Sequence, residues 1–200
     1  MVFVDLLTSQ LLSVGFSGVI LAYVALCAYL SKNKDDRAAN LKAGAIPLAV
    51  LGVYMLASGL YGQFTWPLPG SYNILFYDVY VMFGAVLVGL ALAFHSAVKL
   101  KYMGLFGLMF GATAMLYGAF GYQASLSSAP SILFGLYALF GLGGILGYPL
   151  TLLLDVEKSK NRQGAWQLVP WLFALAVTLG GLLAITICLV AVPAHLASAP

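Results

Sequence analysis

The stretch "GLFGLMFGATAMLYGAFG" (residues 104–121) decides the fold class, because it is long, uncharged and almost entirely apolar. Its small residues recur at alternating spacings of three and four, which places them on one face of a helix. They are Gly104, Gly107, Gly111, Ala114, Gly118 and Gly121. Lipid tails are as apolar as leucine, so helices in a membrane associate through close packing of small residues. The stretch therefore predicts a transmembrane helix with a packing face.

The rest of the chain has the same character. It is 62% hydrophobic and only 8% charged, whereas about a quarter of an ordinary soluble chain is charged. Apolar runs of about 20 residues match the thickness of a bilayer core. We expect one integral membrane domain over residues 1–200. Cys27 and Cys188 lie inside apolar runs and are interpreted as small hydrophobic residues.

Six apolar segments are predicted to cross the membrane. Backbone groups in lipid must be satisfied internally, which favours helices, and the alternation typical of membrane β-strands is absent. The first segment lacks the basic start of a signal peptide and is predicted to stay in the protein. The fold class is thus all-α and polytopic, with helices at about residues 3–30, 44–64, 73–98, 102–122, 130–154 and 168–192.

The positive charges gather in alternate connections. All nine Lys and Arg residues follow the first, third and fifth segments, at Lys32, Lys34, Arg37, Lys42, Lys99, Lys101, Lys158, Lys160 and Arg162. The positive-inside rule then predicts a cell-membrane protein whose three basic loops are cytoplasmic and whose N- and C-termini are both outside. These loops are expected to meet anionic lipid headgroups, so the charge requires no nucleic-acid partner.

The chain also resembles itself. Residues 52–62, "GVYMLASGLYG", match residues 111–121, "GATAMLYGAFG", and "NILFYDVYVMFG" (73–84) matches "SILFGLYALFG" (131–141). This pattern predicts that the second and third helices are repeated as the fourth and fifth. The sixth and first helices would form a third, diverged hairpin around a pseudo-axis. Gly15 and Gly18 give the first helix a packing face like that of residues 104–121.

Candidate site residues are few and polar. Asp5 and Asp78 lie in phase with small residues near the outer interface, and an acid facing lipid would be unfavourable. The outer loop "TWPLPGSYN" (65–73) contributes Trp66, Tyr72 and Asn73 as a rim or lid, with prolines that end the second helix. Tyr80 adds polarity within the membrane, and His95 would lie near an inner mouth. Each of these residues also has an ordinary interpretation as a helix cap, an interfacial anchor or a bond between helices.

Motifs for chemistry are missing. The sequence has no HExxH, no CxxC and no phosphate-binding glycine loop before a lysine. "FYDVY" (76–80) has the Tyr-Asp pair of intramembrane aspartyl proteases, but the second Gly-x-Gly-Asp motif is absent. We therefore expect no catalytic residues, no metal and no cofactor.

Six helices, both termini outside and a repeated hairpin together resemble the urea/amide channel family. "SILFGLYALFG" (131–141) and "VPWLFALAVTLGGLLA" (169–184) are similar to that family's third and last helices. The resemblance implies a homo-oligomer in which each protomer passes urea or short amides. "PLPGSYNILF" (67–76) more closely resembles an uncharacterised family of archaeal and bacterial six-helix membrane proteins. The acetate-transporter family ranks lower, because its Asn-Pro-Ala-Pro signature is absent.

The leading hypothesis is a passive channel or facilitator for a small neutral or weakly acidic solute, working as a homo-oligomer in the lipid bilayer. The alternative is a non-catalytic integral subunit of a larger membrane complex, for example a respiratory one, in which the glycine faces contact other membrane subunits. A membrane enzyme ranks third.

Overall fold

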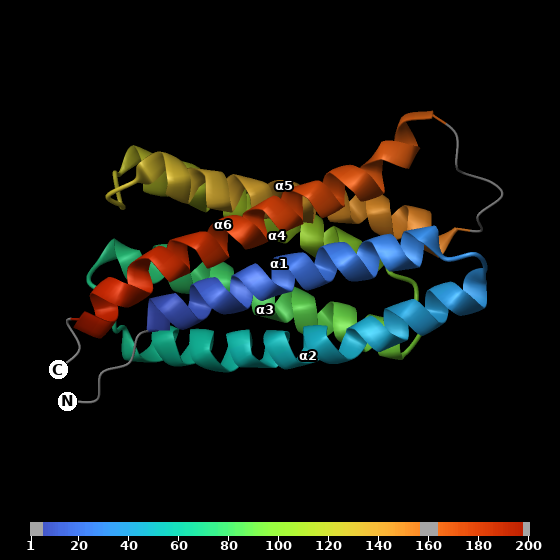
Figure 1. Cartoon of the computed structure of the whole chain (residues 1–200), viewed down its shortest axis with the longest axis horizontal. Coiled ribbons are helices and arrows are strands. Elements are labelled where there is room, and N and C mark those ends of the chain that lie inside the picture. The colour runs from blue at the N-terminus through green and yellow to red at the C-terminus, as the bar shows by residue number, and fades with distance from the viewer. Residues whose placement is uncertain (1–5, 157–163, 198–200) are drawn as a thin grey trace.

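A computed structural model of the chain describes residues 6–156 and 164–197, and within these ranges every regular element is a helix (Figure 1). The elements are α1 (Leu6–Leu30), α2 (Lys34–Thr65), α3 (Ser71–His95), α4 (Lys101–Gln123), α5 (Pro130–Asp155), the short 3₁₀ helix η1 (Gly164–Leu168) and α6 (Val169–Ala197). The predicted fold class is confirmed, since the structure is all-helical and six helices are long and apolar enough to span a membrane.

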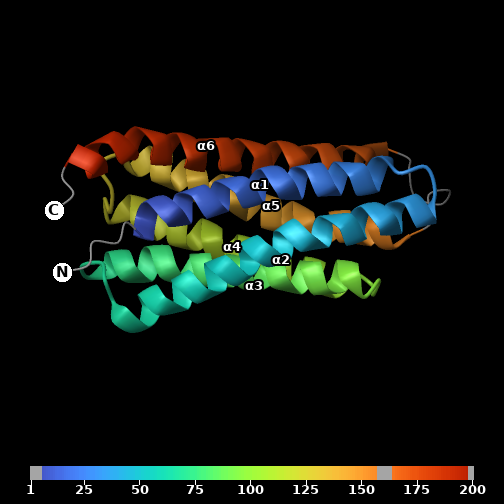
Figure 2. The same ribbon diagram turned by 60° about the horizontal axis from the view of Figure 1, so that its bottom comes forward.

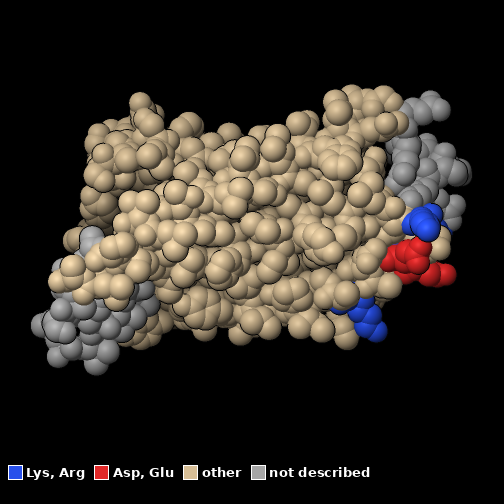
Figure 3. Space-filling view, viewed as in Figure 1, with Lys and Arg blue, Asp and Glu red and all other residues tan. Residues whose placement is uncertain are grey.

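The helices form one elongated bundle and alternate in direction (Figure 1). The start of α1, the end of α6 and the connections at 66–70 and 124–129 lie together, and we call this the terminal end. The connections at 31–33 and 96–100 and the end of α5 lie opposite, at what we call the charged end. Among the described residues visible in Figure 3, the Lys, Arg, Asp and Glu side chains lie at the charged end.

The six helices pack as three antiparallel pairs, α2 with α3, α4 with α5, and α6 with α1. Figure 2 shows α1 running between α6 and α2, so the third pair closes the bundle although its helices are the first and last in the chain. These are the three hairpins that the sequence predicted. The duplication of the sequence itself remains a prediction.

Each pair crosses at two facing glycines. In each, a Cβ atom built on one glycine would lie no more than 3.1 Å from the carbonyl oxygen of the other, and the reverse also holds. Such a spacing leaves no room for a side chain, so the backbones touch at the crossing. The three glycine pairs are Gly52 with Gly84, Gly111 with Gly141, and Gly181 with Gly15.

The other glycines predicted to pack also lie at contacts between helices. Gly18 meets the Val177 carbonyl of α6, and Gly104, Gly107 and Gly118 face α5. Gly121 differs, because its nearest neighbours include Leu75 of α3 as well as Leu133 of α5. The face of α4 therefore joins its own hairpin along most of its length and the α2–α3 hairpin at the terminal end.

The α2 helix begins at Lys34, whereas the sequence suggested a start near residue 44. The Asn33 side chain caps it by accepting a hydrogen bond from the Asp36 N–H at 2.8 Å. Asp35 and Asp36 in the first turn further favour the helix through its dipole. At the other end α2 stops at Thr65, before the prolines, with Trp66 in the left-handed conformation (φ 48°). The other helices end within a few residues of the predicted positions.

Candidate functional site

A stripe of polar side chains on α1 begins the polar part of the interior. Gln10, Ser13 and Ser17 are spaced by three and four residues, so they share one helix face. All three are buried, because this face of α1 turns towards α2 and α3. The opposite face carries Gly15 and Gly18 and packs on α6.

The stripe binds to a tyrosine of α3. The Ser13 hydroxyl lies 2.8 Å from the Tyr80 hydroxyl, and the Ser58 hydroxyl of α2 lies 3.2 Å from it. Ser17 donates to the Ser13 carbonyl at 2.7 Å and lies 3.7 Å from the Met55 sulfur. Tyr80 thus joins three helices through one hydroxyl, in the half of the bundle nearer the terminal end.

The buried side chains of Gln10 and Tyr77 interact with each other. Beyond this contact, the Gln10 side-chain nitrogen and the Tyr77 hydroxyl oxygen have no hydrogen-bond partner in the part of the chain that the structure describes. Tyr77 is fully buried and Gln10 is 5% exposed. We refer to Gln10, Ser13, Ser17, Tyr77 and Tyr80 as the polar cluster, and it has hydrogen-bonding capacity to offer a solute or water.

Asp78 lies next to the polar cluster and bridges three helices. One carboxylate oxygen accepts a hydrogen bond from the Gln63 amide of α2, and the other accepts one from the Tyr117 hydroxyl of α4, both at 3.0 Å. The side chain is half-buried. Tyr137 of α5 makes a further link, because its hydroxyl donates to the Leu75 carbonyl at 2.6 Å. Asp78 therefore faces protein, as its phase with small residues predicted.

The predicted rim loop is fastened by Asn73, which is 1% exposed. Its amide donates to the Gly62 carbonyl and its oxygen accepts from the Leu68 N–H, both at 3.3 Å. Trp66 is 52% exposed, and Tyr72 stacks on Phe76 one turn further along α3 with ring centroids 6.4 Å apart. Asn73 thus holds the loop to the bundle, while Trp66 points away from the interior.

Three phenyl rings separate the polar cluster from the other half of the interior. Phe83 stacks on Phe110 with ring centroids 5.3 Å apart and 10° between the ring planes. Phe140 meets the same ring of Phe83 at 5.3 Å with a 57° tilt. All three are buried and come from α3, α4 and α5. We call them the phenyl barrier.

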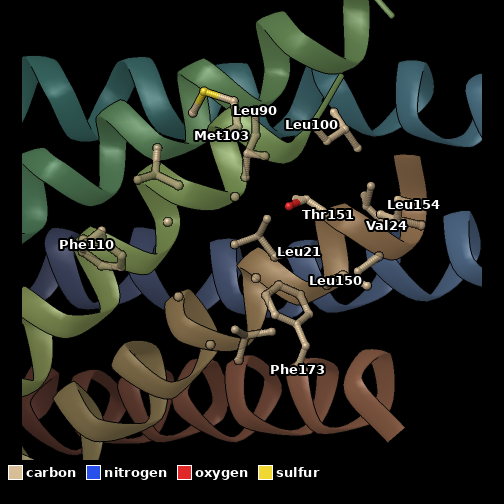
Figure 4. Close-up of a pocket in the computed structure, with 18 of the residues that line it drawn as sticks. Leu21, Val24, Leu90, Leu100, Met103, Phe110, Leu150, Thr151, Leu154 and Phe173 are labelled. Carbon is tan, nitrogen blue, oxygen red and sulfur yellow. The ribbon is translucent and has the colours of Figure 1, made fainter. Parts of the chain in front are cut away.

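An apolar cavity of about 80 Å³ lies on the charged-end side of the phenyl barrier (Figure 4). All six helices line it, with side chains that include Leu21, Leu90, Met103, Leu150 and Phe173. Among the described residues that line it, the one polar side-chain group is the Thr151 hydroxyl, which donates to the Tyr148 carbonyl at 2.7 Å. The cavity therefore offers a ligand a surface of carbon atoms.

A second, wider pocket of about 250 Å³ lies at the charged end and shares lining residues with the cavity. The shared residues are Leu41, Phe94, Leu100 and Leu154. Three cations, Lys34, Arg37 and Lys99, and one acid, Asp155, also line the wider pocket. We call it the basic mouth. The polarity of the interior thus changes from carbon to positive charge across one ring of leucine and phenylalanine side chains.

Two charged residues of the basic mouth hold helix ends together. The buried Arg37 guanidinium donates to the Leu154 carbonyl at 2.6 Å and to the Val156 carbonyl at 3.2 Å, where α5 ends. The Asp155 carboxylate accepts from the N–H groups of Leu100 and Lys101 at 2.9 Å, where α4 begins. Each charge complements a helix dipole, so the shape of the basic mouth is fixed by α2, α4 and α5.

The predicted candidates do not form one site. Asp78, Asn73, Tyr72 and Trp66 lie near the terminal end, with Tyr80 deeper, whereas His95 is exposed at the last residue of α3. His95 is not among the residues that line either pocket, and Asp5 lies outside the described residues.

Sequence reasoning missed most of the side chains that form the polar cluster, the phenyl barrier and the basic mouth. The stripe of Gln10, Ser13 and Ser17 could have been found from its helical spacing. The phenyl barrier and the linking roles of Arg37 and Asp155 depend on contacts between distant helices, so no local signal marks them. Among the described residues, no group of three or more His, Cys, Asp and Glu side chains is placed to hold a metal ion.

Comparison with known proteins identifies a family for the whole chain. The model of a family described as "Protein of unknown function (DUF981)" matches residues 1–198. No curated protein and no solved structure matches the chain. The match covers all six helices, both pockets and the polar cluster.

Proposed function

The chain belongs to the DUF981 family of proteins of unknown function, and we propose that it is a passive facilitator for a small neutral or weakly acidic solute in the cell membrane. One observation carries the proposal. An apolar cavity runs from the basic mouth to the phenyl barrier, and the buried polar cluster begins at Tyr80, one turn of α3 beyond Phe83 on the other side of that barrier. Together they outline a path through the middle of a single chain.

The direction of the path follows from the charges. The described residues place Lys34, Arg37 and Lys99 at the basic mouth, and Lys32, Lys42 and Lys101 lie at the same end. By the positive-inside rule this end faces the cytoplasm, and the terminal end, with the start of α1 and the end of α6, faces outward. Lys158, Lys160 and Arg162, which the sequence analysis also assigned to this side, lie outside the described residues.

The lining of the path favours a solute without a full charge. An ion in the cavity would lose its hydration and find only carbon atoms and one engaged hydroxyl, which is strongly unfavourable. A neutral amide or a protonated acid would lose far less, and it would meet hydrogen-bonding groups again at Gln10 and Tyr77. Pore selectivity of this kind comes from diameter and from the donors and acceptors along the wall.

The direct test is solute-driven swelling of proteoliposomes with urea, acetamide, acetate and glycerol. We expect at least one of these solutes to enter faster than in protein-free vesicles. Phe110→Trp enlarges a ring of the phenyl barrier and is expected to lower that rate severalfold. Phe120→Trp on the same helix is the matched control, because Phe120 is 60% exposed and lies outside the barrier. Equal entry of all four solutes with and without protein contradicts the proposal.

Asp78 is proposed to shape the outer entrance. Both oxygens of its carboxylate accept hydrogen bonds, one from the Gln63 amide and one from the Tyr117 hydroxyl. Asp78→Asn removes the charge and replaces one acceptor oxygen with a donor, so we expect the rate of solute entry in the swelling assay to differ from that of the natural protein. Equal rates for the two proteins would remove Asp78 from the entrance.

The assembly is proposed to be a homo-oligomer. Many large apolar side chains are exposed along the helices, among them Val50, Met109 and Leu182, and in a bilayer these contact either lipid or another copy. The mass of the purified particle distinguishes the possibilities. A particle that contains this chain alone, with a mass equal to a whole number of chains greater than one, supports the proposal. Stoichiometric copurification of other membrane proteins supports a subunit role in a larger complex.

A further inference from the structure

We propose that the basic mouth and the apolar cavity together form a binding site for an anionic amphiphile. The ligand would carry a carboxylate or phosphate head on a single alkyl chain, with the head in the basic mouth and the end of the chain in the cavity. This inference does not rest on transport, because the site can be filled whether or not any solute crosses the phenyl barrier.

The charges of the basic mouth favour an anionic head. Among the residues that the structure describes, Lys34, Arg37 and Lys99 line it together with one acid, Asp155. Both oxygens of that acid accept hydrogen bonds from the backbone N–H groups of Leu100 and Lys101, where α4 begins. The carboxylate is therefore directed towards the start of α4. Arg37 is 8% exposed and held by two carbonyls of α5. A planar guanidinium fixed in this way is suited to binding carboxylate or phosphate oxygens.

The cavity supplies the place for the tail. Its lining is aliphatic and aromatic except for Thr151, whose hydroxyl is engaged, and Figure 4 shows Leu21, Leu150 and Phe173 around the open space. At about 80 Å³, it is smaller than the engineered cavity of about 150 Å³ that holds benzene. The space therefore fits the end of one chain and excludes a pair of chains.

The apolar cavity and the basic mouth are continuous, which favours an amphiphile over a simple anion as the ligand. Leu41, Phe94, Leu100 and Leu154 line both the cavity and the basic mouth. A ligand that filled only the mouth would leave this apolar ring and the cavity behind it without contacts, which an alkyl chain supplies. The four residues come from α2, α3, the start of α4 and α5, so they surround a chain passing between them.

The test uses photolabelling of the full chain in phosphatidylcholine nanodiscs. The probe is a twelve-carbon fatty carboxylate with a diazirine at the end of its chain, and labelled residues are mapped by mass spectrometry. We expect label on cavity residues such as Leu21, Leu90 and Met103. Unlabelled dodecanoate and dodecyl phosphate should displace it, and dodecanol, which lacks the charge, should not. Label spread evenly over lipid-facing residues overturns the proposal.

Two double variants test whether the cations of the basic mouth bind the head. Lys34→Gln with Lys99→Gln removes two cations of the mouth and should weaken cavity labelling about 30-fold, if each cation near a membrane surface contributes as it does to anionic lipids. Lys42→Gln with Lys101→Gln removes two cations at the same end that do not line the mouth, and it should weaken labelling clearly less, because salt screens exposed charges that do not contact the head. Equal effects of the two double variants would overturn the role of the mouth.

Gly147→Leu tests the tail. A Cβ atom at Gly147 meets only a Phe173 ring atom, at 3.8 Å, so a leucine there can extend into the cavity without clashing with backbone. It should abolish labelling of cavity residues. Gly135→Leu is the matched control on the same helix, since nothing lies within 4 Å of its Cβ position and it does not line the cavity. Cavity labelling that survives Gly147→Leu would contradict the proposal.

A competition experiment, in which unlabelled compounds displace the probe, identifies the source of the amphiphile. Added phosphatidylglycerol that displaces the probe as well as dodecanoate does would identify a membrane lipid, inserting one of its chains. Displacement by dodecanoate and dodecyl phosphate alone would identify a free single-chain amphiphile.

Discussion

The two halves of the bundle interior contain different chemistry. Near the terminal end, Tyr80 and Asp78 each hydrogen-bond to two other helices. On the other side of the phenyl barrier lies a cavity of about 80 Å³ surrounded by carbon atoms. The first half is held by directed bonds, which specify one arrangement of helices. The second is held by apolar packing around an open space.

The open space has a measurable cost. Residual cavities destabilise proteins by about 24 cal/mol per Å³, which gives roughly 2 kcal/mol for this one. Hydrogen bonds between membrane helices average about 0.6 kcal/mol, so the cavity offsets about three of them. A ligand or solute that occupies the cavity would restore the lost contacts and stabilise the folded state, which would offset the cost of the empty space.

Phe83→Ala gives the largest expected effect, because it breaks the boundary between the halves. Phe83 contacts both other rings of the barrier, and truncating a buried phenylalanine typically destabilises a protein by about 3–5 kcal/mol. We expect a loss of stability in that range, measured by reversible unfolding in mixed micelles. Phe64→Ala on α2 is the control, because Phe64 is 84% exposed. A loss below about 1 kcal/mol would show that the rings do not act as a packed barrier.

Tyr80→Phe sharpens the comparison within the polar half. The substitution keeps the ring and removes the hydroxyl shared by Ser13 and Ser58, so we expect a loss of about 1 kcal/mol. A double-mutant cycle with Ser13→Ala isolates the bond between the two side chains. Tyr54→Phe, at a tyrosine that is 44% exposed, should change stability little. A coupling energy of zero would mean that Tyr80 contributes through packing alone.

The sequence predicted the fold better than the site, for a physical reason. Hydropathy and small-residue spacing are local properties, and they gave six helices and the packing face of α4. The start of α2 was missed because the prediction followed the apolar run, which begins about ten residues after Lys34 and excludes the charged residues Asp35 and Asp36. Asn33 followed by acids is in fact a helix start signal.

The candidate site was harder to predict because it is made by contacts between distant segments. The bonds from Arg37 to α5 and from Tyr137 to α3 join residues far apart in the chain, and the phenyl barrier draws one ring from each of three helices. Asp78 could be identified as facing protein from its phase, but its partners Gln63 and Tyr117 could not. Membrane helices are all apolar, so their sequences contain little information about which neighbour each face meets.

Thr151→Val gives the smallest expected effect and tests the apolar half. The Thr151 hydroxyl donates to the carbonyl of Tyr148 in its own helix, so it links no two helices. Valine has nearly the same shape and presents a second methyl group to the carbon-lined cavity. We expect stability to change by no more than about 0.3 kcal/mol, because this local bond contributes little to helix stability. A loss as large as that of Tyr80→Phe would mean that the hydroxyl serves the cavity as a polar contact, and the contrast between the two halves would then fail.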